Sequence, residues 1–191
     1  MVDVVRSTFI LGGQRSGKSR RAEMLARQWL DASPAHRAVM IATGQAWDEE
    51  MRERIARHQA DRAQRVPGMA TVEEPLALAG ALRRNSSAHT LIVVDCLTLW
   101  LTNLMMPADP AQALPEAAVM AAGEDLCAAI AAAPGSVVLV GNEIGLGVIP
   151  MGREVRAFVD ALGRLNQQVA AACWRVTLMA AGLPLTLKDR T

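Results

Sequence analysis

The chain has 191 residues, of which 51% are hydrophobic and 20% charged, and its formal net charge is +1. This length suits one substantial core, so we predict a single domain over residues 1–191. Only 3% of the residues are aromatic and the chain is not basic, which argues against a nucleic-acid partner. Because no membrane span, signal peptide or CxxC pair is present in the sequence, we expect a cytoplasmic protein without a disulfide framework.

Short apolar runs alternate with amphipathic helical patterns along the chain. This alternation predicts an α/β fold with a mostly parallel sheet, helices on both faces, and ligands at the carboxyl ends of the strands. The segment 107–115 contains three prolines and no periodicity, so we expect a mobile loop there. The expected strands are 8–11, 38–43, 90–95, 136–140 and 175–180, with 182–188 (GLPLTLK) returning as an antiparallel edge strand.

The motif GGQRSGKS follows the first expected strand and precedes an amphipathic helix, which is the context of a phosphate-binding loop. Glycines allow successive N–H groups and the helix N-terminus to face a polyphosphate. Lys18 is expected to reach the β- and γ-phosphates, and the Ser19 hydroxyl to coordinate Mg²⁺. The residues expected to bind the nucleotide here are Gly12, Gly13, Gln14, Arg15, Ser16, Gly17, Lys18 and Ser19.

Two acidic residues end later strands of the expected sheet. Asp95 ends the hydrophobic run LIVVD, where phosphate-loop proteins place a carboxylate that holds the metal. Its alternative role is to cap the following helix. Glu143, in GNEIGLG, either faces the ligand edge or closes a glycine-rich turn, and the sequence favours neither reading.

The stretch RIARHQADR places His58 on an expected helix over residues 47–62. Trp47, Met51, Ile55 and His58 follow one another at spacings of four, four and three, so they project to one side of that helix. Spacing alone favours a half-buried surface histidine without a chemical role. His36 and His89 lie near strand entrances, which is the end of the sheet away from the expected nucleotide site.

Across nearly its whole length the chain resembles the bifunctional adenosylcobinamide kinase/adenosylcobinamide-phosphate guanylyltransferase family. The segments that carry this resemblance are GGQRSGKSRRAE, IATGQ, WDEEMRERIARHQADR, TVEEP, VVDCLTLWLTNLM, NEIGLGVIP, FVDALGRLNQQVA and GLPLTLK. The joint order of the histidine, DCLTLWLTNL and NEIGLG segments makes the resemblance specific.

This resemblance implies a RecA-like phosphate-loop fold, a homotrimer and a two-step reaction in cobalamin assembly. ATP or GTP first phosphorylates adenosylcobinamide. The residue matching His58 then attacks GTP, and the guanylyl group passes to adenosylcobinamide phosphate to give adenosylcobinamide-GDP. The further nucleotide contacts that it implies are Thr43, Gly44, Gln45, Asp61, Arg62 and Glu73. Asp95 is also expected at the nucleotide, with Ser19 and Asp95 on Mg²⁺, from the motif and strand-end patterns described above.

Several positions depart from the family pattern. The loop after Arg62 is slightly longer and has Met69 near the usual Trp position, Gly141 replaces the usual Ser, and Val159 stands where Arg is common. Two other functions remain compatible with the phosphate loop: a small-metabolite kinase without a covalent intermediate, and a RecA-like ATP-dependent binding module acting on nucleic acid. The latter needs a basic, aromatic-bearing path for its ligand, for which this composition offers little.

Overall fold

The computed structural model describes residues 6–46, 48–148 and 150–190, which form an α/β fold around one mixed sheet. The strands are short, and helices connect most successive strands, as the alternating sequence pattern predicts. In chain order the elements are β1 (Ser7–Gly12), α1 (Lys18–Ala32), β2 (Arg37–Ala42), α2 (Glu49–Arg65), β3 (Ala70–Glu73), α3 (Leu78–Asn85), β4 (Thr90–Asp95), α4 (Leu97–Met105), a 3-10 helix (Pro110–Gln112), α5 (Glu116–Ala132), β5 (Val137–Asn142), α6 (Arg153–Ala172), β6 (Arg175–Ala180) and β7 (Leu183–Asp189).

The seven strands lie in the order β3-β2-β4-β5-β1-β6-β7. All neighbouring strands run parallel except β7, which pairs antiparallel with β6. The expected antiparallel return at the end of the chain is therefore confirmed, and so is the mostly parallel α/β architecture. β5 lies between β1 and β4, so the loop that follows β5 emerges between the loops that follow those two strands.

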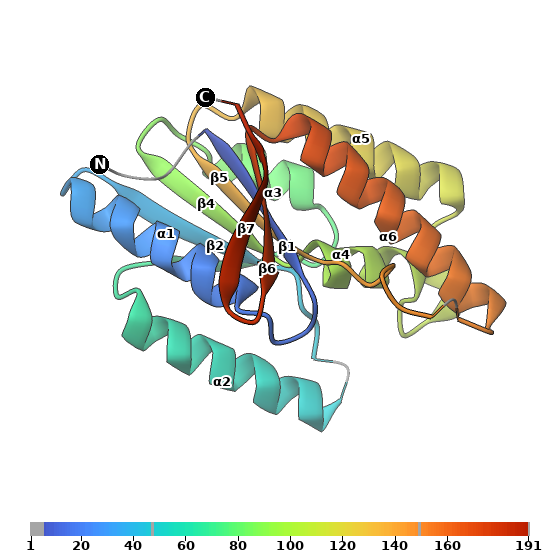
Figure 1. Cartoon of the computed structure of the whole chain (residues 1–191). Helices are drawn as coiled ribbons and strands as arrows, with labels where there is room; N and C mark the ends of the chain where they lie inside the picture. Colours follow the sequence, from blue (N-terminus) through green and yellow to red (C-terminus); the bar gives the residue numbers. More distant parts are fainter. Residues whose placement is uncertain (1–5, 47, 149, 191) are drawn as a thin grey trace.

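Helices cover both faces of the sheet, as the apolar character of the central strands requires (Figure 1). On one face α1 packs through Ala22, Leu25 and Ala26 against strand residues that include Val93. On the other face α3, α4, α5 and α6 form a larger core against the alternate residues of the same strands, such as Ile92. The central strands are thus buried on both sides. This packing holds in place the carboxyl ends of the strands, from which the loops emerge.

The sequence did not predict β3, which pairs with the outer edge of β2. A four-residue strand that is half-exposed carries too little apolar pattern to stand out from its neighbours. The segment 107–115 contains a short 3-10 helix that the sequence pattern did not indicate, in which Asp109 accepts a hydrogen bond from the Ala111 N–H. Trp47, the expected start of the helix that carries His58, lies outside the described residues, and α2 runs from Glu49 to Arg65.

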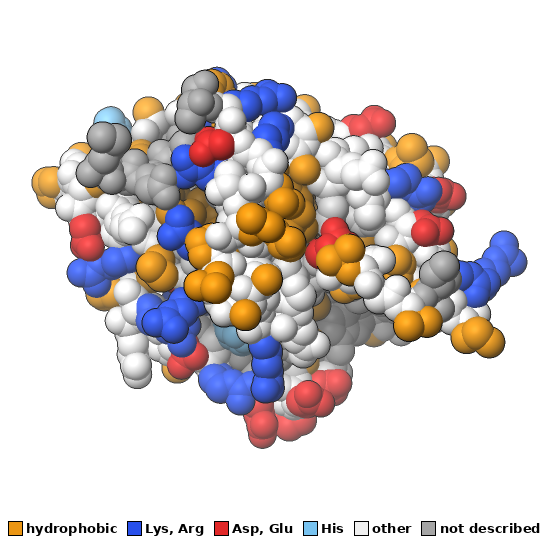
Figure 2. Space-filling view, viewed as in Figure 1, with side chains coloured by type: hydrophobic (Ala, Val, Ile, Leu, Met, Phe, Trp, Pro, Cys, Tyr) orange, Lys and Arg blue, Asp and Glu red, His pale blue; other side chains and the backbone are white. Residues whose placement is uncertain are grey.

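The surface shows two contrasting features. Lysine, arginine, aspartate and glutamate side chains are interspersed over the face drawn in Figure 2, whereas hydrophobic side chains gather near its centre, where β7 lies in Figure 1. Leu183, Leu185 and Leu187 of β7 are all exposed. Among the described residues, no helix combines the length and the apolar character needed to cross a membrane.

Candidate active site

The strand register brings the carboxyl ends of five strands to one edge. Gly12 of β1 pairs with Asn142 of β5, and Ala42 of β2 pairs with both Asp95 of β4 and Glu73 of β3. Parallel strands of an α/β sheet present their ligand-binding loops at this edge. The phosphate loop and the two acidic positions, 73 and 95, which are far apart in the sequence, therefore lie along the same edge of the molecule.

The loop between β1 and α1 has the tight geometry that a phosphate-binding loop needs. Gly17 has a φ of 98°, and a Cβ at Gly12 would lie 2.5 Å from the Met179 carbonyl oxygen and 2.6 Å from the Ser16 hydroxyl. The Gly182 N–H, in the turn between β6 and β7, donates to the Ser16 carbonyl at 3.1 Å and holds the loop from the other side. The two glycines are thus required by the fold, since a side chain at either position meets strain or backbone atoms.

Polar groups of this loop fit an anionic ligand. No side chain caps the N-terminus of α1, so its first N–H groups stay available for a phosphate. The Lys18 side chain is buried and its Nζ donates to the Gly13 carbonyl oxygen at 2.6 Å, which holds the ammonium over the loop. The Ser16 hydroxyl is buried with no hydrogen-bond partner among the described residues. Gln14 and Arg15 are exposed, and Arg15 adopts the left-handed conformation with a φ of 56°.

Asp95 is hydrogen-bonded to the Ser19 hydroxyl, so the two expected metal-holding residues are in contact. Burial raises the pKa of Asp95, and the Ser19 hydrogen bond and the nearby charges of His58, Arg62 and Lys18 offset part of that rise. Asp95 is not the N-cap of α4, which is Cys96 and receives no side-chain cap. The arrangement therefore favours the metal-holding reading of Asp95 over the capping one.

No group of three or more His, Cys, Asp and Glu side chains that could bind a metal ion occurs within the described part of the chain. A phosphate-loop Mg²⁺ site does not need one, because its ligands are a hydroxyl, a carboxylate that often acts through water, and phosphate oxygens. The Ser19–Asp95 pair has the oxygen chemistry that Mg²⁺ prefers.

His58 lies on α2 with an exposed side chain, and its charge acts on Asp95 together with those of Arg62 and Lys18. Such an interaction requires that the middle of α2 lies near the phosphate-loop edge of the sheet. Met51 and Ile55, on the same side of the helix, are half-buried, so the helix packs through them while leaving the imidazole reachable. His36 stacks on Trp29 with ring centroids 3.9 Å apart at the amino end of β2, and His89 lies beside it, away from this edge as the sequence indicated.

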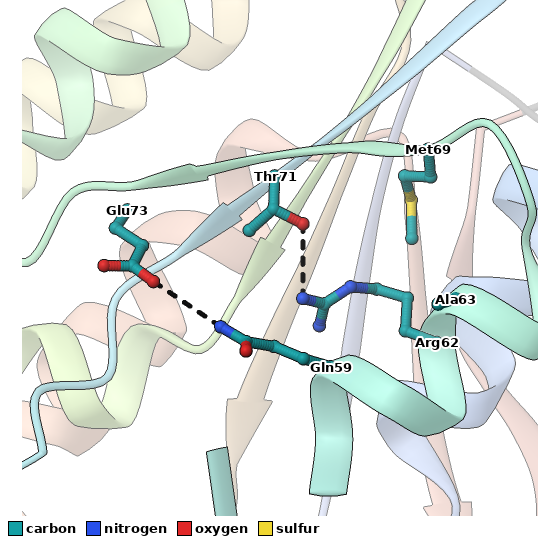
Figure 3. A pocket seen from close by; sticks show the side chains of 6 residues that line it. All are labelled: Gln59, Arg62, Ala63, Met69, Thr71 and Glu73. Carbon is teal, nitrogen blue, oxygen red and sulfur yellow. Dashed lines mark hydrogen bonds between the residues drawn. The ribbon is translucent and has the colours of Figure 1, made fainter. Parts of the chain in front are cut away.

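A pocket of about 340 Å³ opens between α2 and β3 (Figure 3). Arg62 is buried and donates to the Thr71 hydroxyl at 3.2 Å, whereas the Gln59 amide donates to Glu73 at 3.5 Å. Two residues that the resemblance assigns to the nucleotide, Arg62 and Glu73, thus face one hollow from opposite walls. Sequence reasoning did not single out Gln59 or Thr71, although each lies beside an assigned residue on the same element.

Thr43, Gly44 and Gln45, which are also expected to contact the nucleotide, are not among the residues that line this pocket. Thr43 is fully buried, and its hydroxyl donates to the Cys96 carbonyl at 2.7 Å and accepts from the Cys96 N–H at 2.9 Å. Gly44 lies against the side chains of Leu99 and Ile55, and Gln45 is half-buried. The hydroxyl of Thr43 is thus committed to joining β2 to β4, and a nucleotide contact by this residue stays a prediction.

Two departures from the family pattern acquire a structural reason. A Cβ at Gly141 would lie 2.9 Å from the ring of Phe9, so the bulky Phe9 is accommodated by a glycine on the neighbouring strand. Met69 lines the pocket beside Arg62, which places the altered loop after Arg62 in the pocket wall.

Glu143 accepts a hydrogen bond from the Gly145 N–H at 3.0 Å, as the turn-closing interpretation of that residue requires.

Solved structures with a similar fold have low sequence identity to this chain. The flagellar accessory protein FlaH from Methanocaldococcus jannaschii superimposes with a TM-score of 0.52 at 12% identity, covering 96% of this chain and 78% of FlaH. A protein from Pyrococcus horikoshii OT3 gives a TM-score of 0.54 at 9% identity, covering 100% of this chain and 90% of that protein. These similarities support the α/β fold alone.

Sequence relatives are much closer. The bifunctional adenosylcobalamin biosynthesis protein CobP of Pseudomonas aeruginosa is 48% identical over 180 residues, covering 94% of this chain and 96% of the relative. CobU of Escherichia coli K12, which bears the same description, is 36% identical over 188 residues, covering 94% of this chain and 98% of the relative. Residues 8–187 match the family described as cobinamide kinase / cobinamide phosphate guanyltransferase, and the chain therefore belongs to that family.

Proposed function

We propose that this protein phosphorylates adenosylcobinamide and then guanylylates the product through a covalent intermediate on His58. The observation that carries the proposal is the joint placement of a phosphate loop, the Ser19–Asp95 contact and His58 at one edge of the sheet. Membership of the cobinamide kinase / cobinamide phosphate guanyltransferase family supports both activities.

In the first step the aminopropanol hydroxyl of adenosylcobinamide attacks the γ-phosphorus of ATP or GTP. A new O–P bond forms, the bond from the γ-phosphorus to the β,γ-bridging oxygen breaks, and the nucleoside diphosphate leaves while the hydroxyl proton passes to solvent. Lys18 and the N–H groups at the start of α1, which no side chain caps, bind the phosphates and stabilise the charge that develops on them. Mg²⁺, held by Ser19 and Asp95, would supply further neutralisation of that charge.

In the second step a ring nitrogen of His58 attacks the α-phosphorus of GTP. An N–P bond forms and the bond to the β-phosphate oxygen breaks, so pyrophosphate leaves. A phosphate oxygen of adenosylcobinamide phosphate then attacks the same phosphorus, the N–P bond breaks, and adenosylcobinamide-GDP is released. Imidazole suits this role because it is an uncharged nitrogen nucleophile for much of the time near neutral pH, and the covalent intermediate divides one difficult transfer into two easier ones.

The pocket between α2 and β3 supplies candidate contacts for the nucleotide outside the phosphate loop. We assign Arg62 and Glu73 to this role, because they face the same hollow and carry a donor and an acceptor of opposite charge. Thr43, Gly44, Gln45 and Asp61 complete the set that the family resemblance implies. The same resemblance leads us to expect a homotrimer in the cytoplasm, which light scattering and cell fractionation would test.

The deciding experiment is covalent labelling with α-labelled GTP and Mg²⁺, followed by denaturation. We expect protein-bound label that acid removes and base does not, as a phosphoramidate requires, and its loss in His58→Ala. His89→Ala is the matched control, because that histidine is exposed at the amino end of β4, and it should label normally. A protein that phosphorylates adenosylcobinamide but never retains the label would instead be a small-metabolite kinase without a covalent intermediate.

A further inference from the structure

The helix that carries His58 has few buried attachments to the rest of the molecule. α2 lies at the lower side of the structure in Figure 1, beneath α1, and along it Arg62 is the one buried side chain among those described. Its sequence is strongly polar, with acidic residues in the first turn and basic residues in the last. Apolar packing on this helix comes from half-buried residues such as Met51 and Ile55, so specific polar contacts must supply much of what fixes its position.

One such contact joins α2 to the helix of the phosphate loop. Arg65 donates from Nη1 to the Glu23 carboxylate on α1 at 3.0 Å, and from Nη2 to Asp61 on its own helix at 3.0 Å. The Glu23 side chain is only 4% exposed, whereas that of Arg65 is 46% exposed. A carboxylate buried to this extent requires a charged or hydrogen-bonding partner, and Arg65 supplies one with fixed geometry.

The spacing on both helices connects this contact to the reacting groups. Asp61 and Arg65 follow His58 by three and seven residues, so all three lie on one face of α2. Glu23 follows Lys18 by five residues on α1, a separation of about 7.5 Å along the helix axis. The ion pair therefore ties the face that carries the histidine to the helix whose first residues bind the phosphates.

We propose that Glu23 and Arg65 are positioning residues, which hold α2 against α1 and so set the approach of the His58 imidazole to the α-phosphorus of GTP. This inference rests on the proposed function. The phosphoryl transfer to adenosylcobinamide uses the phosphate loop and Asp95 and does not use the imidazole. Loss of the ion pair therefore slows guanylylation of His58 selectively, because displacement of a reacting group by about 1 Å lowers a rate by roughly a hundredfold.

The test compares the two half-reactions in Glu23→Gln and Arg65→Lys. Single-turnover labelling with α-labelled GTP gives the rate of His58 guanylylation, and a coupled assay gives kcat and KM of the kinase step. We expect guanylylation in Glu23→Gln to fall by about tenfold or more, with kinase kcat and nucleotide KM within about twofold of the unsubstituted protein. Arg65→Lys keeps the charge beside Glu23 but cannot bridge to Asp61 as well, so an intermediate rate is expected.

Asp125→Asn is the matched control. It breaks an interhelical ion pair of similar geometry, in which Arg83 of α3 contacts Asp125 of α5 at 2.5 Å on the opposite face of the sheet. Both half-reactions should be unchanged in this variant.

Three results would overturn the inference: unchanged guanylylation in Glu23→Gln, equal loss of both half-reactions in Arg65→Lys, or selective loss in the Asp125→Asn control. Melting temperatures identify a variant that is merely unfolded, and Arg65→Lys then provides the deciding comparison because it retains a cation beside Glu23. Absence of label in the unsubstituted protein would instead refute the proposed covalent intermediate, so the two failures are distinguishable.

Discussion

Replacement of Thr43 by valine tests whether this residue holds the sheet edge together or binds nucleotide. Valine has nearly the same shape, so the substitution removes the hydroxyl without leaving a cavity. In the structure the hydroxyl satisfies the Cys96 N–H at 2.9 Å and donates to the Cys96 carbonyl at 2.7 Å. The carbonyl keeps a second partner, the Trp100 N–H at 3.1 Å, whereas the buried Cys96 N–H loses the acceptor that the structure gives it.

The expected cost follows from these contacts. A buried N–H group without an acceptor costs about 1–3 kcal/mol, and the lost hydrogen bond to the carbonyl about 1 kcal/mol more. We therefore expect the free energy of unfolding to fall by about 2–4 kcal/mol in Thr43→Val. For a chain of this length the melting temperature should drop by on the order of 10 °C.

Urea denaturation followed by circular dichroism measures the change in unfolding free energy. Thr43→Ser is the control, because it retains the hydroxyl and loses one buried methyl group, at a cost of about 1 kcal/mol. The reasoning fails if the valine variant unfolds within about 1 kcal/mol of the unsubstituted protein. Unchanged stability with weakened GTP binding would instead support the nucleotide contact that the family resemblance implies.

Gly12→Ala should abolish the thermal stabilisation that GTP gives, because the new Cβ would lie 2.5 Å from a carbonyl oxygen of β6. Gly13→Ala is the control and should fold normally, because a Cβ there has nothing within 4 Å. Equal behaviour of the two variants would contradict this expectation. Burial raises the pKa of the Cys173 thiol to about 12, so at pH 8 roughly one molecule in ten thousand carries the reactive thiolate at this position. When the protein is treated with iodoacetamide and analysed by mass spectrometry, the half-buried Cys127 should therefore be alkylated before Cys173.

Local features of the sequence determined much of the site. The phosphate loop is contained in one strand, one turn and one helix start, so the motif and its flanking patterns predict it without knowledge of the rest of the fold. The antiparallel return of β7 was predictable for the same reason, since a short turn at Gly182 joins two consecutive strands. The short strand β3 was not, because its pairing with β2 comes from a sheet edge that no local pattern describes.

Contacts between distant residues depended on the tertiary structure. The Ser19–Asp95 hydrogen bond depends on a strand order that places β4 close to β1, with β5 between them, and this order is a property of the whole sheet. The burial of Thr43 and the Glu23–Arg65 ion pair likewise depend on where β2 and α2 come to lie against other elements. The sequence by itself determined which chemistry the chain carries, because each motif is short and continuous. Only the packing of helices on the sheet decided which of those groups meet, because their distances depend on strand order and helix position rather than on spacing along the chain.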